Sequence, residues 1–569
     1  MSEEAAQQRS ERARVFRRRR ATLGAIAAVV VTIAAVITFS GGSDETRSAS
    51  STAAPGSQVP SHAGKTTWLG VSGVKASWVV AENRRPGSRN WHIAPSMPPD
   101  GIQGFASRDS AKLGQNVGLY VTTAAPHFRV EAFRMGYYGG DGARSVWRSP
   151  QYDGVTQPSC IFRPTIGGSF VNMVSCSNWA RSATVTITKT FVQGDYLLKL
   201  TSSAGQESYV PLTVWDPTSK AAYLIMNRTF AEAGWNAYGG YSMYQGLGKC
   251  PPGIASYPVC NRARIVSLDR PFDSGNGASD YFGSEYPLVQ FCEERGLDVT
   301  YITDVTATLH PSLIAAHRAL LSLSHDETWS YEERRGAVDA FEHGTNLVFF
   351  GSAAVLRHVR LQPSSIGPAR EVVAYRSTAE DPLNGNGDPM QVTGNTFENP
   401  PTNLSPSRLT GSLYSGYLTA GFTAPMVVTD GSAWIYKHTG LTTGSKVDGL
   451  ITSDIDHVSG AAFIPPNIQI MAHSPVPLTS AYTNQGTWDG FTYADLSYWT
   501  HPESKAGVID TGTENWIYSL NSCSSSGGNC GVPAVRAMTA NLLHLFGQGP
   551  TGTTHPSIGN RDSVQPPGS

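Results

Sequence analysis

The stretch "RALLSLSHDETWSYEERRGAVDAF", residues 318–341, contains the pattern on which the fold prediction rests. Its first part is an uninterrupted apolar run, which is typical of a strand that is buried on both faces of a sheet. Ser330 and Glu333 then stand at the spacing of a capping box, which predicts a helix that ends near Gly344. A buried strand followed at once by a helix indicates one unit of a parallel α/β sheet.

Further apolar runs lie on either side of this stretch, among them "AAYLIMN", "ARIVSL", "DVTYITD", "TNLVFFG" and "KAGVID". Together with helical patterns between them, these runs predict a doubly wound α/β domain over residues 219–548, with an irregular insertion near 351–480. Upstream, "NVGLYVTT" and "HFRVEAFRM" alternate apolar and polar residues, which predicts a β-sandwich of immunoglobulin-like type over residues 66–218. The expected fold class is therefore α+β and multidomain.

The N-terminus has the pattern of a membrane anchor. Residues 1–20 are basic and precede an uncharged apolar run at 21–39, which is long enough to span a bilayer. The basic flank predicts a cytoplasmic N-terminus and an extracytoplasmic remainder, so we expect a single-pass cell-membrane protein. A cleaved signal peptide is the alternative, and it would give a secreted protein. Residues 40–65 resemble a disordered linker, and residues 549–569 a disordered tail.

Charge and cysteine usage narrow the class further. The formal net charge is -1 and the isoelectric point is about 6.9, which leaves no basic face for nucleic acid. Six cysteines form sequence-local pairs in polar loops, which predicts three disulfides; chance spacing or metal binding is the alternative. The expected pairs are Cys160 with Cys176, Cys250 with Cys260, and Cys523 with Cys530. Cys292 lies at helical spacing with Leu288 and is expected to be a buried thiol.

Candidate site residues follow from the position of strand ends. Ligands of open α/β sheets bind at the carboxyl ends of the strands, and His325, Asp326 and Glu327 lie at such an end. These three residues are the candidate catalytic group. Their alternative role is to cap the next helix or to pair with nearby arginines in a solvated loop.

Two other segments contain candidate functional residues. "GLITSDIDHVSG" places Asp454 close to another carboxylate and a histidine, a set that can hold a cation or act as acid and base. An ordinary polar loop explains that segment nearly as well. "FAEAGWNAYGGYSMYQG" gathers aromatic side chains, including Trp235 and Tyr244, that either pack on the β-rich region or line a groove.

Several long motifs together carry a family resemblance. They include "GLDVTYITDVTATLHPSLIAAHRALLSLSHDETWS", "NLVFFGSAAVLRHVR", "WNAYGGYSMY", "FRMGYYGGDGAR" and "GTENWIYSL". In this ordered series the chain, over roughly residues 75–547, resembles the large (β) subunit family of N,N-dimethylformamidase, including its exported actinobacterial relatives. The resemblance implies a β-rich N-terminal region followed by a domain similar to class I glutamine amidotransferases, which are flavodoxin-like.

The same resemblance implies a chemistry and a ligand set. The family enzyme hydrolyses a small amide with a mononuclear iron that is held by two tyrosines and a glutamate. Thr328 stands where one tyrosine is expected, in "HDETW", and Asp454 aligns with the glutamate. Tyr286 aligns with the other tyrosine. The candidate metal ligands are therefore Asp454, Tyr286 and Glu327.

Three functions are compatible with this altered ligand set. The first is a metal-dependent hydrolase of amide C–N bonds, in which His325, Glu327 or water replaces the missing phenolate. The second is a non-catalytic relative that binds a cell-envelope ligand or partner. The third is a metal-free hydrolase in which His325 is the general base and Asp326 or Glu327 orients it. The resemblance leaves the presence of a small subunit open.

Overall fold

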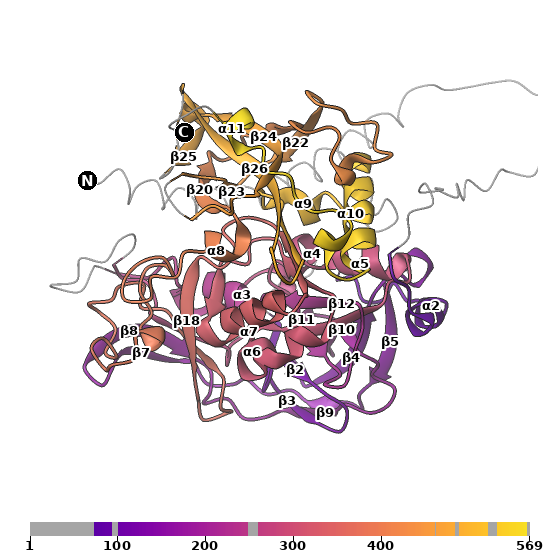
Figure 1. Cartoon of the computed structure of the whole chain (residues 1–569). Helices are drawn as coiled ribbons and strands as arrows, with labels where there is room; N and C mark the ends of the chain where they lie inside the picture. Colours follow the sequence, from indigo (N-terminus) through magenta and orange to yellow (C-terminus); the bar gives the residue numbers. More distant parts are fainter. Residues whose placement is uncertain are drawn as a thin grey trace, which may run out of the picture. The chain divides into compact units, whose positions relative to one another are not determined.

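The computed structural model describes residues 73–93, 101–248, 260–460, 463–483, 487, 489–521 and 532–565. All of them belong to one compact unit, Val71–Ser569. Strands and helices both occur throughout this part of the chain, and the strands form several separate sheets (Figure 1). The chain is therefore a mixed α/β protein, as the sequence predicted.

A seven-stranded sheet forms the largest layer, with the strand order β14-β12-β15-β17-β27-β26-β24. The first five strands in that order are mutually parallel, whereas β26 pairs antiparallel with both β27 and β24. Their bounds, in the same order, are Val299–Thr303, Tyr223–Asn227, Ala319–Leu323, Asn346–Phe350, Gly507–Asp510, Phe491–Thr500 and Gln469–Pro477. Five of the apolar runs in the sequence thus form the parallel part of this sheet.

Helices cover both faces of this sheet, which explains why its strands are apolar without interruption. Side chains such as Ile225 and Leu321 point to one face and pack with α5 (Tyr286–Glu294) and α10 (Pro533–Phe546). Alternate side chains such as Leu224 point to the other face and pack with helices α6 and α7. These two helices lie side by side (Figure 1). They span Asp304–Leu309 and Tyr331–Glu342.

The helix that follows the opening stretch begins as the sequence predicted. The Ser330 hydroxyl oxygen accepts a hydrogen bond from the Glu333 backbone N–H at 3.0 Å. The Ser330 backbone N–H in turn donates to Glu333 Oε2 at 3.2 Å. This capping box satisfies two of the backbone donors that a helix start leaves open, and it fixes α7 directly behind the candidate site loop.

One apolar run does not join the central sheet. "ARIVSL" forms β13, which pairs antiparallel with β19 in a separate four-stranded sheet of order β13-β19-β18-β16. The bounds of these strands are Ile265–Ser267, Glu371–Val373, Arg357–Gln362 and Thr328–Ser330. The sequence pattern shows that a strand is buried but not which neighbour it pairs with, so this partner could not be predicted. The candidate motif "HDETW" thus runs into a short strand, β16, before α7.

The N-terminal region contains two sheets that share one hydrophobic core. One has the order β1-β3-β9, and the other has the path β2-β11-β10-β4-β5, with β6 (Tyr152–Asp153) paired to β4. The strands of the first sheet span Ile102–Ala106, Asn116–Thr123 and Ala183–Thr186. Those of the second span Ser110–Ala111, Glu207–Val214, Gly194–Ser202, His127–Met135 and Ala143–Arg148. The predicted segments "NVGLYVTT" and "HFRVEAFRM" coincide with β3 and β4.

Smaller sheets and short helices complete the described chain. One smaller sheet has the order β23-β20-β25, with bounds Asp454–His457, Leu413–Leu418 and Ala481–Thr483. A second pairs β21 (Ala424–Val427) with β22 (Lys446–Ile451). A third pairs β7 (Ile161–Ile166) with β8 (Ser169–Ser175). The remaining helices are α2 (Ser77–Asn83), α3 (Thr229–Trp235), α4 (Tyr281–Ser284), α8 (Ser407–Thr410), α9 (Asn515–Tyr518) and α11 (Arg561–Val564). Helix α11 lies in the tail for which no folded structure was expected, and the neighbouring Asn560 side chain bonds to the Ile470 backbone at both its N–H and its carbonyl.

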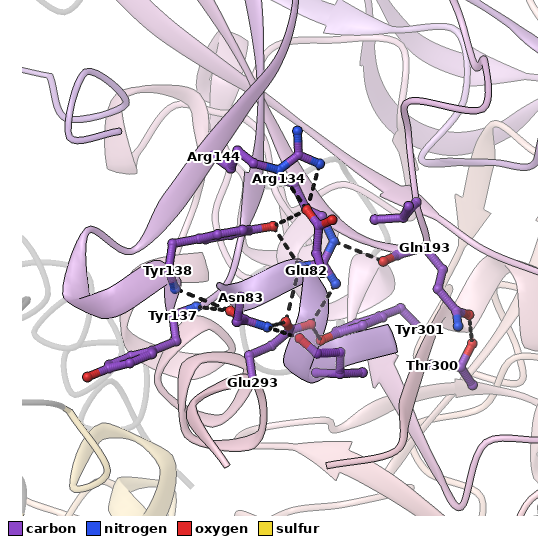
Figure 2. Close-up of polar contacts among 12 residues, drawn as sticks. Glu82, Asn83, Arg134, Tyr137, Tyr138, Arg144, Gln193, Glu293, Thr300 and Tyr301 are labelled. Carbon is purple, nitrogen blue, oxygen red and sulfur yellow. Dashed lines mark hydrogen bonds and ion pairs between the residues drawn. The ribbon is translucent and has the colours of Figure 1, made fainter. Parts of the chain in front are cut away.

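A buried ion pair joins the N-terminal sheets to the helices of the central sheet (Figure 2). Arg134 of β4 lies 2.6 Å from Glu293 Oε1 of α5, and both side chains are fully buried. A second nitrogen of Arg134 donates to Glu293 Oε2 at 3.1 Å, and the Tyr301 hydroxyl donates to Glu293 Oε1 at 2.7 Å. Asn83 and Tyr138 complete the hydrogen bonds of this network. Because every charge has partners, the network can stay buried between the two regions.

The membrane prediction is corrected by the structure. Within the residues that the structure describes, no helix combines the length and the apolar character that crossing a bilayer requires. The predicted membrane partner and single-pass location are therefore wrong. The segment at 21–39 on which they rested lies outside the described residues, as do residues 1–20 and 40–65.

The described cysteines agree with the predicted pairing. Cys160 and Cys176 form a disulfide, which is confirmed. Cys260 is disulfide-bonded, while its expected partner Cys250 lies outside the described residues. Cys523 and Cys530 also lie outside them. Cys292 is a free, fully buried thiol in α5, as expected, and burial raises its pKa.

Candidate functional site

The site loop leaves the central sheet in a tight turn. Ser324, directly after β15, has a φ of +46°, in the left-handed region. Gly351, directly after β17, faces this turn so closely that a Cβ would lie 1.5 Å from the Ser324 carbonyl oxygen. Arg228 Nη1 donates to the His325 carbonyl oxygen at 3.2 Å. These contacts fix the backbone of His325 at the carboxyl end of the parallel strands.

Three potential metal ligands meet at this end of the sheet. His325 follows β15, Glu514 follows β27, and Asp454 opens β23. One ligand atom from each residue lies within 4.8 Å of the other two, and His325 Nε2 is 3.7 Å from Asp454 Oδ2. Ligands of one ion with bonds of about 2.0–2.2 Å lie at most about 4.4 Å apart. Only a small inward movement therefore separates this arrangement from a shared coordination sphere.

Glu327 adds a further carboxylate beside the group. Its Oε2 atom lies 3.8 Å from His325 Nε2 and 3.6 Å from Arg357 Nε. The Tyr244 hydroxyl donates a short hydrogen bond to Glu327 Oε1. Burial alone would raise the pKa of Glu327, but His325, Arg357 and this hydrogen bond outweigh it and lower that pKa below its usual value. Glu327 is therefore held in its charged form.

The carboxylates act in turn on the imidazole. Burial lowers the pKa of His325, yet the negative charges of Glu327, Asp454 and Glu514 outweigh burial and raise that pKa above its usual value. His325 and Asp454 are buried, whereas Glu514 is half-buried. The arrangement concentrates negative charge around one imidazole, which is an environment that attracts a cation.

Two predicted site residues are not brought into this group. Asp326 is buried, and its Oδ2 accepts a hydrogen bond from the Ser322 hydroxyl at 2.8 Å. Burial raises the pKa of Asp326 to about 7. Tyr286 packs with Phe282 and Trp91, and its hydroxyl donates to the Gly142 carbonyl at 2.9 Å. Their side chains therefore serve contacts in other parts of the fold.

Thr328, where the resemblance expects a tyrosine, is buried in β16 and pairs with Arg357 of β18. Within the described chain its hydroxyl has no hydrogen-bond partner. The other acidic residue near Asp454, Asp456, accepts a hydrogen bond from the Ala353 backbone N–H at 2.7 Å. It also interacts with Asp510.

The aromatic segment supplies one wall of the site. Trp235 stacks on Tyr244 with ring centroids 3.8 Å apart, and its ring lies 6.2 Å from that of His325. Arg376 lies over the Tyr244 ring at 4.9 Å. Trp235 is 36% exposed, whereas Tyr244 is half-buried. Part of this segment therefore faces the site, and the indole forms its solvent-facing edge.

Glu514 is the site residue that the sequence analysis missed. It lies four residues after β27, a strand that was predicted correctly. The rule that selected His325, the carboxyl end of a parallel strand, applies equally to Glu514. The family motif "GTENWIYSL" contained it, so its position after a strand was the signal that could have identified it.

Comparison with known protein families gives a match. A family model described as "N,N-dimethylformamidase beta subunit-like, C-terminal" matches residues 129–530. The matched region covers more than half of the chain and includes His325, Glu327, Asp454 and Glu514. A search among curated proteins finds no match.

Proposed function

This chain belongs to the N,N-dimethylformamidase beta subunit-like family, and we propose on that premise that it is a metal-dependent hydrolase of amide C–N bonds in small molecules. The proposed ligands are His325, Asp454 and Glu514. The observation that carries the proposal is that one ligand atom from each of these three residues lies within 4.8 Å of the others at a strand-end site.

The donor set suits the kind of metal that the family resemblance implies. Imidazole and carboxylate groups bind iron and other divalent first-row metals, and they are the groups present here. The phenolate expected at position 328 is absent, because Thr328 stands there. Tyr286, the other expected phenolate, bonds to Gly142 instead. His325 and Glu514 supply two donors in place of the two tyrosines, so the proposed ligand set is altered in composition rather than depleted.

The remaining residues have roles that do not depend on the metal's identity. A bound divalent ion would supply Lewis-acid polarisation of the amide carbonyl and activation of a water molecule. Glu327, held charged by Arg357 and by the Tyr244 hydroxyl, is placed to accept a proton beside His325. Trp235 offers a flat apolar surface against which a small amide can lie.

The finer description of the fold belongs to the same proposal. Five parallel strands with helices on both faces support a domain similar to class I glutamine amidotransferases. The two N-terminal sheets around one core support an immunoglobulin-like sandwich.

Metal content tests the ligand assignment. The purified chain should retain about one equivalent of iron or another divalent metal, measured by elemental analysis after dialysis. Asp454→Asn and Glu514→Gln should each weaken metal retention at least about tenfold, because each removes one charged ligand. Asp448→Asn, an exposed aspartate on β22, is the matched control and should retain metal like the unmodified chain.

Amide hydrolysis tests the activity separately. Release of dimethylamine from N,N-dimethylformamide should require the metal and fall with the same two variants but not with the control. A chain that holds no metal in any preparation would refute the ligand assignment. Full metal occupancy without hydrolysis of this amide or of other small amides would refute the hydrolase and favour a binding protein.

A further inference from the structure

A second cavity lies between the N-terminal sheets and the central sheet. Its volume is about 90 Å³, and strands β1, β10 and β11 line one side of it. Asn227 at the end of β12 and residues of α3 and α4 line the other side. Among the described residues that line it, none is one of the four side chains of the candidate site. The cavity is therefore a separate feature of the fold.

Buried polar atoms in this cavity lack partners. Asn227 Nδ2 donates to Asp195 Oδ1 at 2.6 Å, and that bond brings the two side chains together. Within the described chain, Asp195 Oδ2, Asn227 Oδ1 and the Tyr281 hydroxyl have no hydrogen-bond partner. The three residues are only 2%, 6% and 5% exposed. Unpaired buried acceptors are costly, and such a group calls for a donor that the protein itself does not supply.

The charges around the cavity favour a cationic donor. Two glutamates that line it, Glu232 and Glu285, share Arg228, at 2.6 and 3.8 Å. Asp195 has no arginine, lysine or histidine within 4.0 Å in the described chain. Burial raises the pKa of Asp195 to about 7, which agrees with a carboxyl group that lacks a counter-ion.

Three arginines line the cavity: Arg370 and Arg270 are engaged elsewhere, whereas Arg108 forms no ion pair with Asp195 in the described chain. Arg370 pairs with Asp269 at 2.7 Å. The guanidinium of Arg270 donates to the backbone carbonyls of Tyr238, Tyr241 and Asn236. Neither cation is directed at Asp195 by any of these bonds.

We propose that this cavity is a second ligand site, which binds a small alkylammonium ion through Asp195 and Asn227. An ammonium group has several N–H donors, so it can serve Asp195 Oδ2 and Asn227 Oδ1 together. Apolar side chains such as Leu212 and Phe105 line the same cavity and suit a short alkyl chain. A dry cavity of about 150 Å³ takes benzene, which has six non-hydrogen atoms, so a cavity of 90 Å³ takes roughly three or four.

A second pocket adjoins the cavity. This outer pocket, of about 230 Å³, shares Gly104 and Phe272 with it. The exposed Asp273 lies on the lining of this outer pocket. The inference does not depend on the proposed hydrolysis, because binding here involves none of the residues of the candidate site.

The test is a titration of the full chain with propylammonium, followed by protein-observed NMR or calorimetry, at about pH 8, where Asp195, with a pKa of about 7, carries its charge. We expect saturable binding at one site, and at least about tenfold weaker binding of 1-propanol, which has the same size but no charge. Asp195→Asn should weaken propylammonium binding at least about tenfold, because it removes the charged acceptor. Asp273→Asn, in the outer pocket, is the matched control and should bind like the unmodified chain.

A second variant separates loss of the site from loss of folding. Ala278 lines the cavity and is buried, so Ala278→Val reduces its volume without changing its charge. It should also weaken propylammonium binding, while each variant keeps a cooperative melt. Equal affinity of Asp195→Asn and the unmodified chain, or no saturable binding of propylammonium, would overturn the proposal and leave a cavity that holds water only.

Discussion

At the scale of single residues, Asp195 gives a prediction about stability and pH. Burial raises its pKa to about 7 in the folded chain, whereas a free aspartate has a pKa of about 3.9. Between these values the folded state keeps a proton that the unfolded state has lost. The stabilising contribution of Asp195 is therefore complete below about pH 4 and is lost as the pH rises to about 7.

Asp195→Asn removes this dependence and keeps an oxygen that can accept from Asn227. The free energy of unfolding of the variant, relative to the unmodified chain, should rise between about pH 4 and pH 7 and stay level above. The expected rise is about 1–4 kcal/mol, since one pKa unit corresponds to about 1.4 kcal/mol. Urea unfolding at several pH values measures it, with the exposed Asp273→Asn as control. A difference that stays flat over this range would contradict the assigned shift.

The candidate site shows what residue-level prediction can and cannot reach. The strand-end rule selected His325 and Glu327, and these two do lie together with Asp454. It also selected Asp326, which bonds to Ser322 instead. Neighbours on a loop share a position in the sequence but not a side-chain direction, because local φ and ψ set that direction. Tyr286 rested on alignment alone, and its hydroxyl bonds to Gly142.

At the scale of elements, the capping box of α7 is the feature that sequence spacing predicted best, and it can be tested directly. Ser330→Ala removes the acceptor for the Glu333 backbone N–H. It also removes the contact between the hydroxyls of Ser330 and Thr308 at 2.8 Å. The free energy of unfolding should fall by about 1 kcal/mol, within the usual range of 0.5–2 kcal/mol for a lost helix cap.

Chemical unfolding of Ser330→Ala measures this loss. Glu332→Gln, an exposed change in the first turn of the same helix, is the matched control and should alter stability by no more than about 0.5 kcal/mol. Equal stability of Ser330→Ala and the unmodified chain would show that the cap does not hold α7. Because α7 follows the site loop directly, the two variants can also be compared for metal retention.

Elements with a strong apolar pattern were predicted well, but the strands with which they pair were not. The apolar runs of β12, β14, β15 and β17 were recognised as buried strands, and they are parallel neighbours. The equally apolar β13 pairs with β19 instead. The three residues of β13 do not determine which strand it pairs with, since long-range pairing depends on where the rest of the chain places an open strand edge. The segment 351–480 was predicted to be an irregular insertion, yet it contains β24, which forms an edge of the main sheet. The sequence pattern did not show that this strand joins the sheet.

At the scale of the whole molecule, the N-terminal sheets and the central sheet meet through buried charge as well as apolar contact. The sequence pattern predicted both regions but gave no indication of how they join. Arg134 and Glu293 lie 159 residues apart, and each sits in an element with an otherwise apolar environment. Only the assembled fold shows that the two residues neutralise one another (Figure 2). The same interface contains the cavity beside Asp195.

A double-mutant cycle on Arg134 and Glu293 tests how much this contact contributes. Arg134→Met leaves a buried glutamate without its cation, so it should lower the free energy of unfolding by about 3–5 kcal/mol. Glu293→Leu should cost a similar amount for the converse reason. The double variant should cost clearly less than the sum, because neither charge is then left unpaired, although Tyr301 and Tyr138 still lose a partner. Equilibrium unfolding of the four proteins gives the coupling energy.

The same cycle on Arg148 and Glu131 is the matched control. These residues join two strands of one N-terminal sheet, with Nε and Oε1 2.8 Å apart, but the arginine side chain is 65% exposed. Water and salt screen that pair, so its coupling energy should stay below about 1 kcal/mol. If both cycles gave the same small value, burial would add nothing at the Arg134–Glu293 contact. The two regions would then be held together by apolar packing alone, and the network around Glu293 would only avoid the cost of unpaired buried charge.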